Sequence, residues 1–500
     1  MTTDAARQPS PLNFAPGEAY ADAVRMFQGI PGIERAPNGR LWATWYGGGV
    51  TEDRHNYVML VTSGDDGRTW SGLKLVIDPD RDGPCRAFDP CLWLDPGGRL
   101  WLFWAERHRS VQLWAITTEN PGDESPTWTE PRHVAEGIMM NKPLVTSQGH
   151  WLLPVAMWRR DDSCRVVAST DQGRTWSLRG AASVPDPKDR NCDEHMLVER
   201  QDGSLWMLVR TQYGIGESVS DDGGKTWSPV SPSAIQHATA RFFIRRLASG
   251  KLLLVKHGPI EKRTGRSDLT AYLSDDDGKT WGGGLLLDGG AGVSYPDGVQ
   301  APDGRIYTIH DYSRSGAKLI LMSVFTEADV AAGKPVTEAC RLRGVVNQAT
   351  GVNPGRRPRK ADYTLDPNAD GEALLQGPGA DVEPLEGEAD TFAKGRLLFT
   401  DREYALTEVP EELAGKRFVR SSIERIRVVC RKPGVVYIVT PAKRRNRDSL
   451  ADALGKLGFR KARLAEFVLF PGRANVVTTY QKRVEAGETL TLGKWGVLIH

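Results

Sequence analysis

Four nearly identical segments place serine, aspartate and threonine at a fixed spacing. They read SGDDGRTW (63–70), STDQGRTW (169–176), SDDGGKTW (220–227) and SDDDGKTW (274–281). Oxygen side chains in this pattern suit a calcium loop, a sugar site or a turn. A calcium loop needs several oxygen ligands at alternating positions and usually a distal glutamate, and that pattern is absent. Aspartate accepts backbone N–H bonds, glycine supplies left-handed backbone and tryptophan packs, so we interpret the segments as turns, with repeated sugar sites as the alternative.

The spacing of these turns predicts the elements that carry them. The segments start 106, 51 and 54 residues apart, so the first gap spans about two periods. A degenerate copy is therefore expected near residue 118, where TTENPGDESPTWTEP retains Thr127 and Trp128. Self-similarity at a period of about 50 residues is typical of repeat folds and propellers.

A second repeated marker gives the number of units. Glycine-containing turns precede short apolar stretches such as NGRLWATW and GGRLWLFW, which is a hairpin signal. The turn glycines fall at residues 39, 98, 149, 203, 250 and 304, which indicates six units. We predict an all-β protein with a six-bladed β-propeller over residues 20–335. A β-sandwich with repeated hairpins is the alternative.

The C-terminal part of the sequence changes character twice. Residues 336–395 are polar and rich in proline and glycine, which predicts a linker or an irregular excursion over the surface. Strand-like patterns resume in 396–500, for example RIRVVCRKPGVVYIVTP. We therefore expect a small, separate, β-rich and sandwich-like accessory domain there, with no motif that assigns it a ligand.

Composition excludes several function classes. A net charge of +2 offers no strong field for nucleic acid or for a membrane surface. The six cysteines form no CxxC pair and no HExxH motif is present, so we expect no metal site and no cofactor. The N-terminal residues lack an apolar signal region, which predicts a cytoplasmic protein, or a secreted one if the sequence is trimmed. The oligomeric state is left open.

The repeated turn closely resembles the Asp box of the sialidase (neuraminidase) superfamily, whose enzymes are six-bladed propellers. The resemblance covers about 20–335 and carries no information on 396–500. It implies a retaining glycosidase with a tyrosine nucleophile activated by a glutamate, an aspartate as acid/base, and three arginines that hold the sugar carboxylate. A neutral phenol is a poor nucleophile, so a nearby carboxylate must accept its proton. A planar guanidinium binds a carboxylate through two parallel hydrogen bonds.

The resemblance assigns the catalytic roles to three residues. CDEHMLVERQDGSLWMLVRT resembles the segment in which the glutamate precedes an arginine on the next strand, which implies Glu194 as the base. GVSYPDGVQAPDGRIYTIHDY resembles the nucleophile segment, which implies Tyr295. GGGVTEDRHNYVMLVTSGDDGRTW occupies the acid/base position, which implies Asp53. A purely structural role is the alternative for each.

The same segments suggest residues that bind the substrate. Two carboxylate-binding arginines are implied at Arg210 and, just before a box, at Arg266, with Arg263 as the second choice for the latter. Glu52 lies beside Asp53. In IHDYSR, His310 and Arg314 are candidates for lining the pocket, although a structural histidine is the competing interpretation.

One element of the family pattern is missing. The family opens with Arg-Ile-Pro, whereas this sequence has glycine at the first position: Gly29-Ile30-Pro31. Loss of one charge-assisted partner in a closed pocket costs roughly 1.5–3 kcal/mol. Either another arginine fills the space, or the substrate is not a sialic acid; the candidates for the first case are Arg25, Arg54, Arg86 and Arg314.

Three functions fit these observations. The first is an exo-acting retaining glycoside hydrolase that releases a terminal acidic sugar, sialic acid or a relative, from a glycan. The second is a propeller enzyme of different specificity, either a glycosidase for a uronic or neutral sugar or a polysaccharide lyase. The third is a noncatalytic glycan-binding propeller. The expected partner in each case is a glycan.

Overall fold

The computed structural model describes residues 9–79, 85–107, 110–192, 194–352, 374–375, 377–402, 404–442, 449–462, 464, 466–470 and 475–500. The chain divides into two compact units, Met1–Arg359 and Lys360–His500. None of the helices in the described part is long and apolar enough to cross a membrane.

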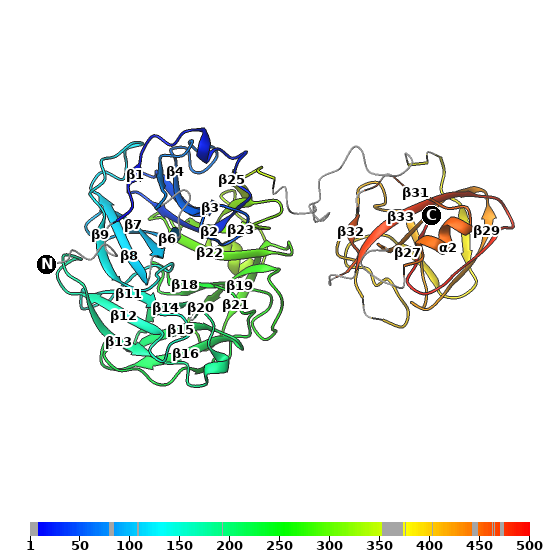
Figure 1. Cartoon of the computed structure of the whole chain (residues 1–500). Helices are drawn as coiled ribbons and strands as arrows, with labels where there is room; N and C mark the ends of the chain where they lie inside the picture. Colours follow the sequence, from blue (N-terminus) through cyan, green and yellow to red (C-terminus); the bar gives the residue numbers. More distant parts are fainter. Residues whose placement is uncertain are drawn as a thin grey trace. The chain divides into compact units, whose positions relative to one another are not determined.

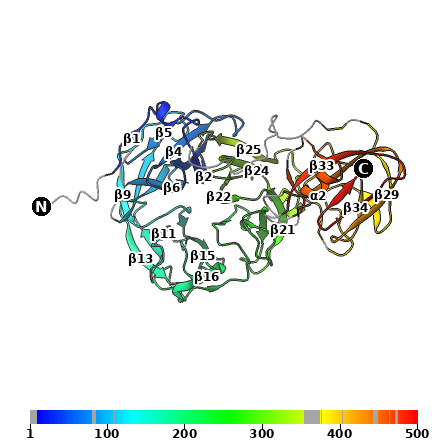
Figure 2. The same ribbon diagram turned by 45° about the vertical axis from the view of Figure 1, so that its right-hand side comes forward.

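Unit 1 contains six antiparallel sheets that follow one another in chain order around a ring (Figure 1, Figure 2). We call them blades 1 to 6. Blade 1 consists of β2 (Phe27–Arg35), β3 (Leu41–Gly48), β4 (Asn56–Ser63) and β5 (Leu75–Ile77), with β1 (Leu12–Asn13) added at its outer edge. Blade 2 consists of β6 (Arg86–Leu94), β7 (Leu100–Arg107), β8 (Val111–Thr118) and β9 (Arg132–Glu136). Blade 3 consists of β10 (Leu144–Val145), β11 (Trp151–Ala156), β12 (Cys164–Ser169) and β13 (Ser177–Ala182).

The second half of the ring repeats this order. Blade 4 consists of β14 (His195–Glu199), β15 (Leu205–Thr211), β16 (Gly214–Ser220) and β17 (Ser231–Pro232). Blade 5 consists of β18 (Phe243–Arg246), β19 (Leu252–His257), β20 (Leu269–Ser274) and β21 (Gly282–Asp288). Blade 6 consists of β22 (Val293–Gln300), β23 (Ile306–Tyr312), β24 (Leu319–Phe325) and β25 (Arg341–Gln348). Short 3-10 turns cover Glu18–Tyr20 and Pro187–Asp189.

The six-bladed propeller predicted from the sequence is confirmed, but it extends past residue 335. Blade 6 has no box, and the short helix α1 (Glu327–Ala332) stands in its place, capped by Thr326. The outer strand β25 then pairs with β24. The residues of β25, RLRGVVNQ, are largely exposed. An edge strand on the rim needs no apolar face, and the sequence of β25 therefore looks like that of a linker.

Unit 2 is β-rich, as predicted. One sheet orders β26 (Asp381–Pro384), β29 (Ile426–Lys432) and β34 (Thr489–Leu492). The other orders β27 (Glu388–Thr391), β28 (Arg417–Arg420), β35 (Val497–Ile499), β30 (Gly434–Pro441), β33 (Val476–Val484) and β31 (Arg460–Lys461), with β32 (Phe467–Val468) also paired to β33. The helix α2 spans Ala451–Lys456. Because β26 and β27 precede residue 396, this domain begins earlier than expected; residues 353–373 of the predicted linker lie outside the described residues.

The boxes are turns held by their own side chains. In the first box the Asp65 carboxylate accepts the Thr69 N–H at 2.9 Å and the Thr69 hydroxyl at 2.6 Å. The Ser63 hydroxyl accepts the Gly67 N–H at 3.0 Å. The other three boxes repeat this geometry. These hydrogen bonds, led by those from Thr69, lower the pKa of Asp65 to about 2.

The degenerate copy near residue 118 also packs as a box does. The Trp128 ring lies 6.0 Å from the Trp42 ring in an edge-to-face contact. The Trp42 indole donates to the Pro121 carbonyl at 2.8 Å. This loop therefore fixes blade 2 against blade 1 although its aspartate turn is lost.

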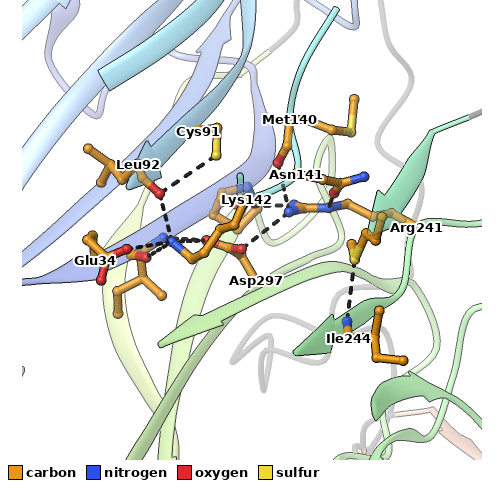
Figure 3. Close-up of polar contacts among 12 residues, drawn as sticks. Glu34, Cys91, Leu92, Met140, Asn141, Lys142, Arg241, Ile244 and Asp297 are labelled. Carbon is orange, nitrogen blue, oxygen red and sulfur yellow. Dashed lines mark hydrogen bonds and ion pairs between the residues drawn. The ribbon is translucent and has the colours of Figure 1, made fainter. Parts of the chain in front are cut away.

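A cluster of buried charges joins the inner strands at the centre of the ring (Figure 3). The Lys142 ammonium donates to the carbonyls of Ile33 at 2.6 Å and Leu92 at 2.7 Å. It also lies 3.1 Å from a Glu34 oxygen and 3.3 Å from an Asp297 oxygen. This one side chain thus connects blades 1, 2, 3 and 6.

Arg241 completes the cluster from the side of blade 5. Its guanidinium donates to Asn141 Oδ1 at 2.6 Å and approaches Asp297 at 3.4 Å and the Pro31 carbonyl at 3.4 Å. The Asn141 amide in turn donates to the carbonyl of His195 in blade 4 at 2.7 Å. We call Glu34, Asn141, Lys142, Arg241 and Asp297 the central hub, because together they bond to all six blades.

Candidate active site

Three predicted residues meet in one buried contact. Glu194 lies just before β14, Arg210 on β15 and Tyr295 on β22. The Tyr295 hydroxyl lies 3.1 Å from Glu194 Oε1, and one Arg210 nitrogen donates to the same oxygen at 2.7 Å and to the Tyr295 hydroxyl at 2.8 Å. The side chains are 4 to 6% exposed. A tyrosine–carboxylate pair separated by 101 residues is therefore at hydrogen-bond distance.

The electrostatics of this contact keep the phenol neutral in the empty site. Burial, followed by the negative charge of Glu194, raises the pKa of Tyr295, while Arg210 opposes the shift. A neutral phenol next to a carboxylate can transfer its proton as it attacks an electrophile. The second Glu194 oxygen, Oε2, is buried and has no hydrogen-bond partner in the described part of the chain. One acceptor of the base is thus unused.

Tyr295 occupies a strained backbone position. Its φ is 54°, in the left-handed region, and it precedes Pro296. The pairing of β22 with β23 shifts register between Ser294 and Asp297 at this point. Bulges of this kind re-aim a side chain, and strained residues cost about 1–3 kcal/mol and gather at functional sites.

The same combination of a positive φ and a register shift recurs on the inner strands of two neighbouring blades. Ile30 on β2 has φ 57° and Asp89 on β6 has φ 48°, and both also precede proline. Each lies at a register shift of its strand pair. The dipeptides Ile-Pro, Asp-Pro and Tyr-Pro therefore mark corresponding positions of blades 1, 2 and 6.

Asp89 is a site residue that sequence reasoning missed. It is 2% exposed and receives no hydrogen bond from any residue that the structure describes. Burial, then the charges of Glu194 and Glu52, raise the pKa of Asp89 to about 8. An alignment of FDPCL (88–92) with SYPDG (294–298) could have identified Asp89, because it places this acid at the position that Tyr295 has in blade 6.

Two further arginines lie against the ring of Tyr295. The guanidinium carbon of Arg314 is 4.3 Å from the ring centroid and that of Arg266 is 5.7 Å away. Arg266 is oriented by the Ser294 hydroxyl at 3.1 Å and the Thr239 carbonyl at 3.2 Å. Arg210 Nε and one terminal nitrogen of Arg314 are buried without a partner among the described residues. Unused donors beside the Tyr295 ring are suited to an anion.

Arg314 fills the space left by Gly29. A Cβ atom added at Gly29 would lie 2.7 Å from Cδ and 2.8 Å from Cγ of Arg314. Asp311 fixes this arrangement, because its Oδ2 accepts from Arg314 Nε at 2.9 Å and from the Ile30 N–H at 2.8 Å. An arginine of blade 6 thus occupies the space that opens at Gly29.

The loop between β3 and β4 carries the other predicted acids. The Asp53 carboxylate accepts the backbone N–H groups of Val50 at 3.0 Å, Thr51 at 3.3 Å and His55 at 2.9 Å, so it caps its own loop. Its neighbour Glu52 points to the site instead and accepts from Arg314 at 2.8 Å.

The remaining candidates lie outside this group. His310 was a candidate for lining the pocket, but it is fully buried with Nε2 3.2 Å from Asp288, which favours the competing interpretation of a structural histidine. Arg263 donates a hydrogen bond to the Gln212 carbonyl, and Arg25 donates one to the Gln28 side-chain oxygen. Among the described residues, no group of three or more His, Cys, Asp or Glu is arranged to hold a metal ion.

Six repeated blades and a buried tyrosine–glutamate pair surrounded by arginines define a propeller of the sialidase type. The sequence model of the BNR repeat-like domain matches residues 39–308. The chain belongs to this BNR-repeat family of the sialidase superfamily.

Curated relatives agree with this assignment. The chain is 25% identical over 323 residues to a sialidase of Micromonospora viridifaciens and 26% identical over 299 residues to a sialidase of Paraclostridium sordellii. The alignments cover 55% and 50% of this chain. They span 48% of the first relative, about half its length, and 71% of the second.

Solved structures show the same fold. The Hadza microbial sialidase Hz136 superposes with a TM-score of 0.51 at 20% identity, over 61% of this chain and 67% of that one. A leech intramolecular trans-sialidase superposes with a TM-score of 0.50 at 15% identity, over 65% and 71% of the two chains.

Proposed function

We propose that this protein is an exo-acting retaining glycoside hydrolase that releases a terminal acidic sugar, sialic acid or a close relative, from a glycan. The observation that carries the proposal is the Tyr295 hydroxyl 3.1 Å from Glu194 Oε1, beneath the guanidinium of Arg314. A phenol paired with a base suits nucleophilic attack. The surrounding guanidinium groups suit a substrate with a carboxylate next to the reacting carbon.

The reaction takes place in two balanced steps. In the first step, Tyr295 Oη forms a bond to the anomeric carbon while the glycosidic bond breaks. The phenol proton of Tyr295 passes to Glu194, and a carboxylic acid protonates the departing glycosidic oxygen. Water then attacks the anomeric carbon and gives its proton to that carboxylate. The tyrosyl bond breaks, and Glu194 returns the proton to the phenolate.

Two aspartates compete for the role of proton donor. The donor must hold a proton at working pH. The Asp53 carboxylate accepts hydrogen bonds from three backbone N–H groups of its own loop. Asp89 accepts none from the described residues and its pKa is raised to about 8 by burial. The ligand-free geometry favours Asp89, while Asp53 lies next to the Glu52 carboxylate that reaches the site.

Arg314 favours an acidic sugar over a neutral one. Without Arg314 the site would retain Arg210 and Arg266 alone, and a neutral substrate would be as reasonable. The Arg314 side chain occupies that space, so a third guanidinium lies at the ring of Tyr295.

The proposal is tested with a panel of 4-methylumbelliferyl glycosides that includes the α-sialoside and β-glucuronide. We expect turnover of the α-sialoside by the wild type, and its loss in Tyr295→Phe and Glu194→Gln. A fluorinated sialosyl fluoride should label Tyr295, as read by peptide mass spectrometry. Unchanged hydrolysis in both variants would refute the mechanism. An unsaturated product absorbing in the near ultraviolet would identify a lyase, and glycan binding without turnover a noncatalytic propeller.

A further inference from the structure

Arg314 is opposed by two carboxylates of different character. Asp311, which accepts from Nε, is fully buried. Glu52, which accepts from a terminal nitrogen at 2.8 Å, is 45% exposed. The other terminal nitrogen is buried and has no partner in the described part of the chain. One carboxylate thus anchors the arginine, and the other covers it from the solvent side.

Glu52 occupies part of the edge of the Arg314 guanidinium that a substrate carboxylate would bind. A guanidinium binds a carboxylate best through two parallel N–H bonds. Since Asp311 holds Nε, the remaining pair of Arg314 donors is the two terminal nitrogens, and Glu52 takes one of them. An incoming anion would reach a single free nitrogen and would meet a like charge.

The loop that carries Glu52 does not depend on this contact. The Asp53 carboxylate holds the loop through three backbone N–H groups, and the Asn56 side chain bonds the Thr51 carbonyl at 2.9 Å. Glu52 makes no other hydrogen bond to the described residues. Its side chain can therefore rotate into water while the loop keeps its shape, and an exposed ion pair of this kind contributes little to stability.

We propose that Glu52 is an internal stand-in for the sugar carboxylate: it neutralises Arg314 in the empty site and is displaced into solvent when an anionic sugar binds. Glu52 is then a specificity-determining residue that lowers the affinity of the site for anions. It discriminates against ligands whose carboxylate makes fewer bonds to Arg314 than Glu52 does. The inference rests on the proposed function, because it assumes an anionic sugar at Arg314.

The test compares Glu52→Gln with Glu338→Gln, a matched loss of one charge at an exposed site outside the cluster. Binding of 2-deoxy-2,3-dehydro-N-acetylneuraminic acid and of its methyl ester is measured by calorimetry for the full chain. We expect Glu52→Gln to tighten binding of the acid about tenfold. The methyl ester should bind the variant and the wild type equally, and Glu338→Gln should match the wild type with both ligands.

The outcomes separate this inference from the proposed function. Equal or weaker binding of the acid by Glu52→Gln, with the wild type still binding it, would overturn the role of Glu52 alone. Equal tightening of the acid and the ester would also overturn it, because the effect would not depend on the ligand's charge. If neither protein binds the acid or hydrolyses the α-sialoside, both proposals fail together.

Discussion

The propeller holds two clusters of buried charge that both include a residue of the inner strand β22, and they differ in how completely they are bonded. In the central hub, none of the side-chain nitrogens and oxygens of Lys142, Arg241, Glu34 and Asp297 is a buried atom without a partner, within the part of the chain that is described. In the active-site cluster, Glu194 Oε2, Arg210 Nε and one nitrogen of Arg314 are such atoms. The clusters are close in sequence, since Tyr295 and Asp297 are two residues apart on β22.

The difference separates a structural role from a binding role. Buried charge is costly unless its hydrogen bonds are made, so a complete network stabilises one arrangement of the strands. An incomplete network carries a cost in the empty protein that a ligand can remove. The two clusters also differ in backbone strain. Tyr295 and Asp89 of the active-site cluster have positive φ, whereas Lys142, Arg241 and Asp297 of the hub do not.

The sharpest way to test this comparison is to neutralise the incomplete cluster. Glu194→Gln should lower kcat by about 10²–10⁴, because the phenol of Tyr295 loses its base. The free energy of unfolding should fall by less than in the hub, because removing the charge relieves the unpaired Oε2 but leaves Arg210 without its buried counter-charge. Activity assays and urea denaturation measure the two effects. A loss of stability as large as that expected in the hub would show that Glu194 has a structural role similar to the hub's.

A larger loss of stability is expected in the hub. Lys142→Met leaves Glu34 and Asp297 without their shared cation, so unfolding free energy should fall by about 3–5 kcal/mol. Urea denaturation followed by tryptophan fluorescence measures this change, with the exposed Lys334→Met as control. A loss below about 1 kcal/mol would mean that the hub tolerates an unpaired charge and that completeness of bonding does not distinguish the clusters.

Exchanging the residues at positions 29 and 314 tests whether Arg314 serves as the third arginine of the site. Arg314→Gly should raise KM for an anionic sugar by about ten- to a hundredfold, as expected for one charge-assisted bond. Gly29→Arg alone should be destabilising, because its Cβ would lie 2.7 Å from Arg314. The double variant Gly29→Arg/Arg314→Gly should recover part of the lost affinity. If the double variant binds no better than Arg314→Gly, the two positions do not serve one site.

The last expected effect concerns Asp89 and pH. Its pKa is about 8 in the folded protein because of burial and nearby carboxylates, against 3.8 for a free aspartate. Between these values the unfolded chain has lost the proton that the folded chain keeps, so stability falls as pH rises from about 4 to about 8. The slope from this group is at most about 1.4 kcal/mol per pH unit.

Asp89→Asn should remove that slope. Urea denaturation of the variant and the wild type at a series of pH values measures it, with Asp53→Asn as the matched acid-to-amide control. Identical slopes in the wild type and Asp89→Asn would contradict a protonated Asp89, and with it the assignment of proton donation to this residue.

Features with a local cause were predictable. The box turns arise from bonds between residues two to four apart, such as Asp65 with Thr69, and their period predicted a repeat, while the turn glycines gave the number of blades. Glu194, Arg210 and Tyr295 were proposed from the resemblance of their segments to those of the sialidase superfamily, and the structure brings their side chains together. The strand β25 was missed because an exposed edge strand lacks an apolar pattern.

Features that depend on contacts between blades were not predictable. His310 lies next to a site segment in sequence, but strand alternation directs it to Asp288. Burial raises the pKa of Asp89, and the charges of Glu194 and Glu52, which belong to blades 4 and 1, raise it further. The hub includes residues from 34 to 297, and no local pattern marks them as partners.

The sequence by itself determined the repeat and the turn chemistry, because each depends on residues that are close along the chain. Only the tertiary structure decided how the space at Gly29 is filled. Arg314 is 285 residues away in sequence, yet ring closure places blade 6 beside blade 1, and the guanidinium is held there by Asp311. The physical reason is that packing between the first and last blades sets this distance, and periodicity carries no information about it.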